Sequence, residues 1–130
     1  MSELPPRRSF FHLFVWFWSP VLIYVAVIFG VSAQPNLAPP FGFSNADKLM
    51  HMIEYGGLGF LMARALRASA RIRFAVVAAL IVTVIGAAIG AGDELFQRTI
   101  PGRESSPIDW LADVTGLLFA QIFFLLFTHD

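Results

Sequence analysis

The sequence contains no cysteine, and charged residues make up only 14% of its 130 residues. The lack of cysteine excludes a disulfide-stabilised scaffold, a thiolate zinc site, an iron–sulfur cluster and a cysteine nucleophile. Nine Lys and Arg residues balance nine Asp and Glu residues, so no net positive field attracts nucleic acid, and we expect no such partner. Any chemistry must rest on carboxylates, three histidines, basic side chains and the backbone.

Hydrophobic residues make up 57% of the chain, against the ~45–50% that is usual in soluble domains. A helix needs about 20 predominantly apolar residues to cross the hydrocarbon core of a bilayer. Four stretches reach that length. The sequence therefore predicts one all-α membrane domain over residues 1–130, a bundle of four transmembrane helices at about 10–32, 47–67, 74–98 and 107–127.

The first apolar stretch must be distinguished from a cleaved signal peptide. Arg7-Arg8 resembles the basic segment of such a peptide, and Val31-Ser32-Ala33 resembles a cleavage site. The apolar run, however, is far longer than the usual ~7–15 residues of a signal peptide, so we expect a retained helix. Ser19-Pro20 predicts a kink within it, which a membrane helix tolerates.

The basic residues are unevenly distributed between the two sides of such a bundle. Six of the nine fall on the side of the termini and three on the other: Arg7, Arg8, Arg64, Arg67, Arg71 and Arg73 against Lys48, Arg98 and Arg103. The positive-inside rule then places both termini in the cytoplasm, an N-in/C-in topology. Most of the acidic residues fall on the outer side.

The connections carry turn and capping signals. Pro101-Gly102 predicts a tight turn between the third and fourth helices. Serine or asparagine before a helix predicts an N-cap, and proline favours the first helical position. The expected caps are Ser44 or Asn45 for the second helix and, before Pro107, Ser105 or Ser106 for the fourth.

Polar residues recur at helical spacing on three of the predicted helices, always near the outer side. An ionised side chain at the bilayer centre costs at least ~2.5–3.5 kcal/mol, so these faces are expected to turn inward and meet. We therefore predict one polar cluster of Asp47, His51, Glu54, Tyr55, Glu94, Gln97, Arg98, Arg103, Asp109 and Asp113, in a pocket open to the outer side. Small residues such as the Gly86/Gly90 pair predict close helix packing rather than ligand binding.

Two kinds of role were assigned within the cluster. As candidate catalytic residues we take His51, Glu54, Glu94 and Asp109, with His51 and Glu54 as a proton-transfer pair. As candidate ligand-binding residues we take Asp47, Lys48, Tyr55, Gln97, Arg98, Arg103 and Asp113. An architectural role is the alternative, in which Arg98 and Arg103 form ion pairs with the acids of the neighbouring helices.

The polar residues, in this order, resemble the VanZ-like family of bacterial membrane proteins. The resemblance covers about residues 46–119. It rests on Asp47-Lys48-x-x-His51-x-x-Glu54-Tyr55, Glu94-x-x-Gln97, Pro101-Gly102-Arg103 and Asp109-x-x-x-Asp113-x-x-Gly116. Many members have Asn where this chain has Asp113. The family takes its name from a member associated with resistance to the glycopeptide teicoplanin, so the resemblance implies a multi-pass protein of the bacterial cytoplasmic (inner) membrane with a connection to the cell envelope.

Three functions remain open at this point, and neither enzyme status nor oligomeric state is fixed. In the first, the cluster binds or modifies the headgroup of a membrane lipid or cell-wall precursor, with Lys48, Arg98 and Arg103 holding its phosphate. In the second, its carboxylates and His51 bind a divalent cation or protons, although no tight ligand motif such as HExxH is present. In the third, the chain is a non-enzymatic binding or assembly module.

Overall fold

The structure, a computed structural model, describes residues 7–38, 41–70, 72 and 74–128. These residues form helices and connections without any strand, which confirms the all-α prediction. The helical elements are α1 (Phe10–Leu13), η1 (Phe14–Trp18), α2 (Ser19–Ser32), α3 (Ala46–Ser69), α4 (Ala75–Gln97) and α5 (Pro107–Phe127).

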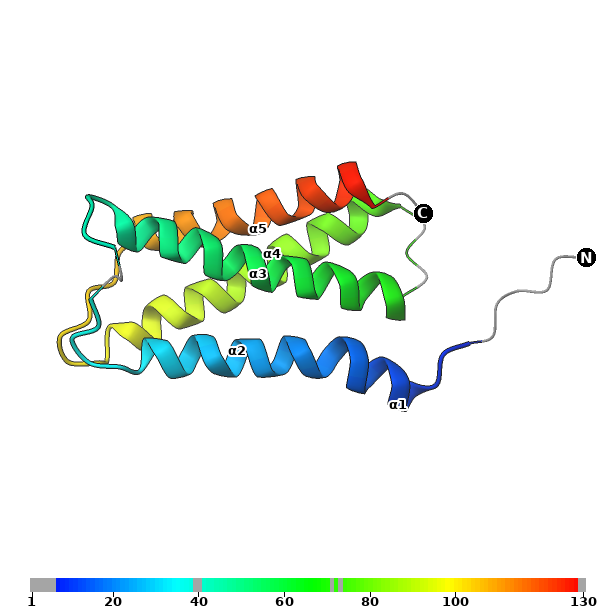
Figure 1. The fold of residues 1–130 in the computed structure, drawn as a ribbon, viewed down its shortest axis with the longest axis horizontal. Coiled ribbons are helices and arrows are strands. Elements are labelled where there is room, and N and C mark those ends of the chain that lie inside the picture. The colour runs from blue at the N-terminus through cyan, green and yellow to red at the C-terminus, as the bar shows by residue number, and fades with distance from the viewer. Residues whose placement is uncertain (1–6, 39–40, 71, 73, 129–130) are drawn as a thin grey trace, which may run out of the picture.

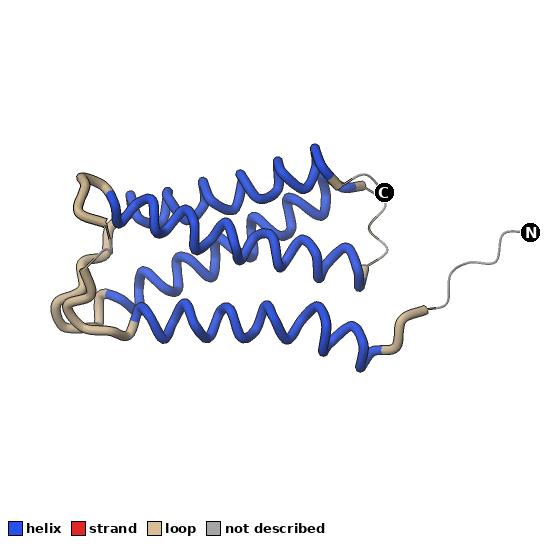
Figure 2. The backbone as a smooth tube through the Cα atoms, in the orientation of Figure 1, coloured by secondary structure: helices blue, strands red, loops and turns tan. Residues whose placement is uncertain are grey.

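The helices run side by side along the long axis of the molecule, and consecutive ones alternate in direction (Figure 1). α1, η1 and α2 follow one another without a break and form the first helical run. The connections at 33–45 and 98–106 lie together at one end, which we call the loop end (Figure 2). The first and last described residues lie at the opposite end, which we call the terminal end.

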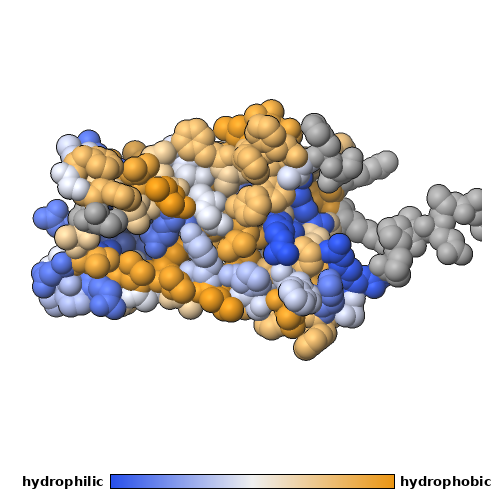
Figure 3. Space-filling view, in the orientation of Figure 1, coloured by the Kyte–Doolittle hydropathy of each residue, from blue (hydrophilic) through white to orange (hydrophobic). Residues whose placement is uncertain are grey.

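Three helical segments are long and apolar enough to cross a membrane: Phe10–Ser32, Ala75–Gln97 and Pro107–Phe127. Apolar side chains dominate the middle of the face in Figure 3, and polar ones gather toward its two ends. α3 has 24 residues, roughly 36 Å of helix, but too polar a composition to qualify by itself. The structure thus supports three of the four predicted spans, and the four-span, N-in/C-in topology stays a prediction.

The first helical run is irregular just before Ser19-Pro20. η1 is a π-helical turn, a common site of deformation in helices. Pro20 has no N–H to offer the carbonyls one turn before it. Two side chains serve these carbonyls instead: Ser19 Oγ donates to Val15 O at 2.6 Å, and Arg64 of α3 donates to Trp16 O at 3.0 Å. The predicted irregularity is therefore present, and α3 helps to stabilise it.

Glycines allow α3, α4 and α5 to approach closely. A Cβ atom at Gly116 would lie 2.9 Å from Met52 C and 3.0 Å from Gly56 N, so the backbones of α5 and α3 are in contact there. A Cβ atom at Gly86 of α4 would lie 2.5 Å from Cδ2 of Leu117, which is fully buried. The predicted packing role of the small residues is thus supported, and the approach brings the polar faces of the three helices together.

Candidate functional site

Buried polar side chains gather near the loop end of α3, α4 and α5. Asp93 and Asp113 have 0% exposure, and Glu94, Gln97 and Asp109 have 5%, 2% and 4%. We call the set linked by the contacts described below the polar cluster: Asp47, Lys48, His51, Tyr55, Asp93, Glu94, Gln97, Asp109 and Asp113. The three acidic stripes predicted from the sequence therefore converge in space.

His51 stands at the junction of the three helices. Its Nδ1 atom lies 2.7 Å from Oδ1 of Asp113 on α5 and 3.7 Å from Oε1 of Glu94 on α4. One potential ligand atom from each of His51, Glu94 and Asp109 lies within 4.8 Å of the other two. The imidazole is therefore surrounded by carboxylates from two neighbouring helices.

The sequence analysis paired His51 with Glu54, which the structure places differently. In the described residues the Glu54 carboxylate forms no hydrogen bond or ion pair. It is the backbone carbonyl of Glu54 that makes a tertiary contact, accepting a hydrogen bond from Tyr24 of α2 at 2.9 Å. Asp113 is thus the carboxylate that holds His51, because it lies directly opposite on α5.

Lys48 is the cation that pairs with Asp109. It contacts both Asp47, its neighbour on α3, and Asp109 in the first turn of α5. Neither Arg98 nor Arg103 forms an ion pair within the described part of the chain; Arg98 is exposed and the Nε atom of Arg103 is buried without a partner. The arginine ion pairs considered from the sequence are therefore not those observed, because Lys48 already lies level with the first turn of α5.

Asp93 is a member of the polar cluster that the sequence analysis did not select. Its Oδ2 atom accepts from Tyr55 at 3.3 Å and from Gln97 at 3.3 Å, and Gln97 also donates to Ser32 of α2 at 3.2 Å. A signal was present, because Asp93 lies three residues after Gly90, on the glycine face of α4. The stripe drawn through the adjacent Glu94 missed it.

The loop between α4 and α5 is attached to the cluster by serines. Ser105 Oγ lies 2.7 Å from Oε2 of Glu94 and 2.9 Å from the Glu94 carbonyl, contacts not foreseen from the sequence. Ser106 caps α5 by accepting from the Asp109 N–H at 3.2 Å, as predicted. The turn at Pro101-Gly102 is also confirmed, with φ of 75° at Gly102.

The start of α3 shows a further difference. Asn45 occupies the predicted N-cap position, but its backbone is left-handed, with φ of 62°, and its side chain makes no capping hydrogen bond. Asp47 and Lys48 follow in the first turn, with side-chain exposures of 44% and 27%. These two residues form the edge of the polar cluster that meets solvent.

The polar cluster carries more negative than positive groups. Its five carboxylates face only Lys48 and the imidazole of His51. Three buried carboxylate oxygens receive no hydrogen bond: Oδ1 of Asp93, Oε1 of Glu94 and Oδ2 of Asp113. Because burying an uncompensated carboxylate costs several kcal/mol, such atoms call for a proton or a bound cation.

Two cavities lie elsewhere on the molecule. One of about 780 Å³ lies at the terminal end, between the first helical run and α3. The other, of about 310 Å³, is an apolar groove where α3 and α5 meet, lined by residues such as Met52 and Phe123. Neither is lined by the polar cluster, so the expected open pocket does not coincide with either of these cavities.

Apolar helices with a buried polar cluster at one end define an α-helical membrane protein. The chain belongs to the VanZ/LLP1 family, which matches residues 4–128 and confirms the resemblance seen in the polar motifs. Comparison with curated proteins and with solved structures gives no significant match.

Proposed function

We propose that the polar cluster binds a divalent cation at the outer face of the bacterial cytoplasmic membrane and, through it, a phosphate headgroup of an envelope lipid or cell-wall precursor. The observation that carries the proposal is the convergence of His51, Glu94 and Asp109 within 4.8 Å, with Oε1 of Glu94 lacking any hydrogen-bond donor. A cation would supply the positive charge that this oxygen lacks.

The spacing of the donor atoms suits one ion. Metal–ligand distances of about 2.0–2.6 Å place neighbouring ligand atoms some ~3–4.8 Å apart. One imidazole with two carboxylates is a donor set for Mn²⁺ or Zn²⁺ rather than for Ca²⁺, which prefers oxygen ligands alone. Asp113, next to His51, is positioned to orient the imidazole in the manner of a second-shell carboxylate.

The charge of the cluster explains why a cation has to mediate headgroup binding. Lys48, one of three basic residues expected to hold a phosphate, is already paired with two carboxylates. A bare phosphate would therefore meet net negative charge. A divalent cation would offset that charge and keep open coordination positions for phosphate oxygens, with Arg103 in the adjacent loop as a further donor. Proton transfer by His51 or Glu54 remains an additional hypothesis.

The part of the cluster around Asp93 favours an architectural role instead. Both Tyr55 and Gln97 direct their donors at one carboxylate oxygen, and Gln97 extends the contact to Ser32 on α2. This arrangement ties α2, α3 and α4 together. We therefore expect Asp93→Asn to lower the free energy of unfolding while leaving cation affinity within about twofold of the wild type.

The cation is tested with Mn²⁺ and the full-length protein in nanodiscs of zwitterionic lipid, by electron paramagnetic resonance. We expect one bound Mn²⁺ per chain with nitrogen modulation from an imidazole. His51→Gln should abolish the modulation and, like Glu94→Gln, weaken binding at least tenfold. His12→Gln, at the terminal end, and Glu104→Gln, on the exposed loop, are the matched controls. Equal Mn²⁺ binding by all variants, or none by the wild type, would refute the cation site.

The headgroup is tested separately by native mass spectrometry of protein extracted from bacterial membranes. A phosphate-bearing envelope lipid should remain bound in the presence of Mn²⁺ and dissociate when a chelator is added. Retention of the same lipid by the His51→Gln variant in chelator would contradict cation-mediated binding. Loss of the lipid under all conditions, with Mn²⁺ still bound, would leave the cation site and remove its proposed ligand.

A further inference from the structure

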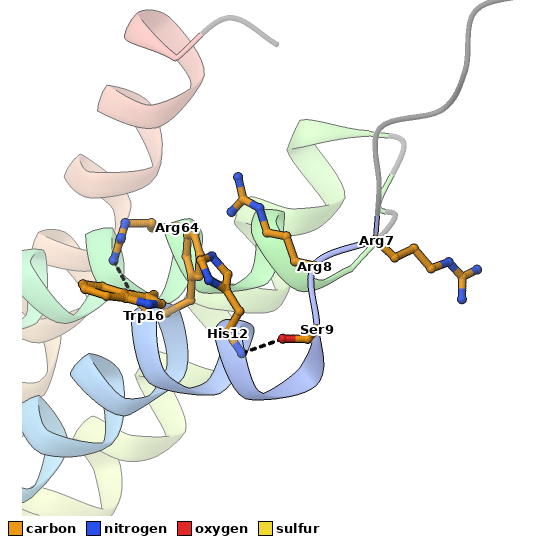
Figure 4. A pocket seen from close by; sticks show the side chains of 7 residues that line it. Arg7, Arg8, Ser9, His12, Trp16 and Arg64 are labelled. Carbon is orange, nitrogen blue, oxygen red and sulfur yellow. Dashed lines mark hydrogen bonds between the residues drawn. The ribbon is translucent and has the colours of Figure 1, made fainter.

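The larger of the two cavities lies at the terminal end and is unrelated to the polar cluster. It has a volume of about 780 Å³, within the ~300–1,000 Å³ of small-molecule sites. Its lining comes from the residues before α1, from the first helical run and from α3, and Figure 4 shows these side chains. The lining residues that matter here are Arg8, His12, Trp16, Phe17 and Arg64.

The cavity is basic and has no acidic residue in its lining. Arg7, Arg8 and Arg64 all line it, and none of them forms an ion pair within the described residues. Arg7 points away from the other side chains in Figure 4, whereas Arg8 and Arg64 extend alongside His12. Unbalanced guanidinium charge in a hollow of this size favours an anionic ligand.

The two inward arginines are held in place by aromatic and backbone contacts. The guanidinium carbons of Arg64 and Arg8 lie 4.5 Å and 5.0 Å from the centre of the Phe17 ring. Arg64 also donates to the Trp16 carbonyl, next to the irregular turn before Pro20. A guanidinium has five N–H donors, and stacking leaves its edge free to bind an oxyanion. Both side chains are thus ordered before any ligand binds.

The surroundings of the cavity point to a lipid rather than to a soluble anion. Phe10, Phe11 and Trp16 beside it have exposures of 84%, 75% and 60%, although they begin an apolar span. Exposed aromatic side chains at a span end lie at the level of the lipid headgroups, where phosphates are found. Their apolar surfaces would contact the acyl chains of a lipid whose phosphate occupies the cavity.

We propose that this cavity binds the phosphate of an anionic phospholipid, with Arg8 and Arg64 as its two guanidinium ligands. The inference rests on charge, aromatic stacking and position at a span end, and is independent of the proposed cation site. The positive-inside rule would place this lipid in the cytoplasmic leaflet, on the opposite side of the membrane from the polar cluster.

The test uses the full-length protein in nanodiscs containing equal amounts of phosphatidylglycerol and phosphatidylcholine, followed by native mass spectrometry of retained lipid. We expect preferential retention of phosphatidylglycerol, weakened at least tenfold by Arg64→Gln and by Arg8→Gln. Arg98→Gln, an exposed arginine at the loop end, is the matched control and should retain phosphatidylglycerol like the wild type. Equal retention of the two lipids, or no effect of either cavity variant, would overturn the proposal.

Two further measurements keep the interpretation firm. Arg8 makes no hydrogen bond in the described chain, so Arg8→Gln tests the site even if Arg64→Gln disturbs the contact with α1 and η1. Inorganic phosphate is the probe for a soluble ligand. If millimolar phosphate displaces phosphatidylglycerol from the wild type completely, the cavity is an oxyanion site without lipid preference, and the assignment to a phospholipid is wrong.

Discussion

Replacing Gly116 with alanine should separate α5 from α3 and thereby destabilise the whole molecule. The added Cβ would overlap the Met52 carbonyl and lie 2.9 Å from its carbon and 3.0 Å from Gly56 N. Contacts of this kind are normally ~3.5–4.0 Å, so the helices must move apart by about 0.5 Å or more. Because the opposing atoms belong to the backbone, no side-chain rotation can relieve the overlap. We expect a loss near the upper end of the ~1–3 kcal/mol typical of overpacking.

The matched control is Gly92→Ala on α4, where a Cβ atom would meet nothing within 4 Å. Alanine is the better helix former by up to about 1 kcal/mol, so this variant should be neutral or slightly more stable. Both are measured by reversible unfolding in mixed detergent micelles, followed by circular dichroism. Equal stability of the two variants would refute the close backbone contact between α3 and α5.

The same displacement should be felt at the polar cluster. Gly116 lies three residues after Asp113, and Met52 directly follows His51, so moving the two backbones apart stretches the 2.7 Å contact between His51 and Asp113. Mn²⁺ affinity should therefore fall together with stability in Gly116→Ala and remain unchanged in Gly92→Ala. Unchanged Mn²⁺ affinity in a clearly destabilised Gly116→Ala protein would show that the cation site does not depend on this packing.

Three other variants test single contacts, each by the same unfolding assay. Lys48→Met leaves the buried Asp109 without its cation and should cost about 2–3 kcal/mol, a loss that adding Asp109→Asn should largely restore; an additive double variant would contradict the ion pair. Trp110→Phe removes the hydrogen bond from the indole to the Ala87 carbonyl, at 2.9 Å, and should cost about 1 kcal/mol. Ser106→Ala removes the cap of α5 and should cost about 1 kcal/mol, whereas Ser106→Asn should retain it.

The helix positions were largely predictable from the sequence. The predicted range 107–127 coincides with α5, and 10–32 coincides with the first helical run; the other two helices differ by at most two residues at either end. Long apolar stretches bounded by capping serines, prolines and charged residues leave little freedom for where a membrane helix begins and ends. The π-helical turn before Pro20 follows from the missing N–H of proline.

The pairing of side chains within the cluster was less predictable. Asp93 and Glu94 are adjacent and point about 100° apart on a helix, so the rotation of α4 decides which of them meets Tyr55. That rotation is set by the contacts of Gly86 and Gly90 with α5, which no property of α4 alone reveals. The stripe analysis located the polar face but not the partner of each residue.

The choice of cation for Asp109 shows the same limit. Arginine is the usual partner in buried ion pairs, and Arg98 and Arg103 are close to Asp109 in the sequence. Lys48 is distant in sequence but adjacent in space, because α3 and α5 pack along their length at Gly116. Local sequence distance favoured the loop, whereas the helix packing favoured Lys48.

The first helical run has few buried side chains: on α2 only Val21, Ile28 and Ser32 are buried. The cation ligands proposed here come from α3, α4 and α5, and α2 contributes Ser32 alone to the neighbouring hydrogen bonds. Most of α2 therefore has lipid as its neighbour, and its outward side chains are constrained by little more than hydrophobicity. Among related chains, this segment should accordingly diverge fastest, and a synthetic peptide of its sequence should be able to complement a shortened chain that lacks it.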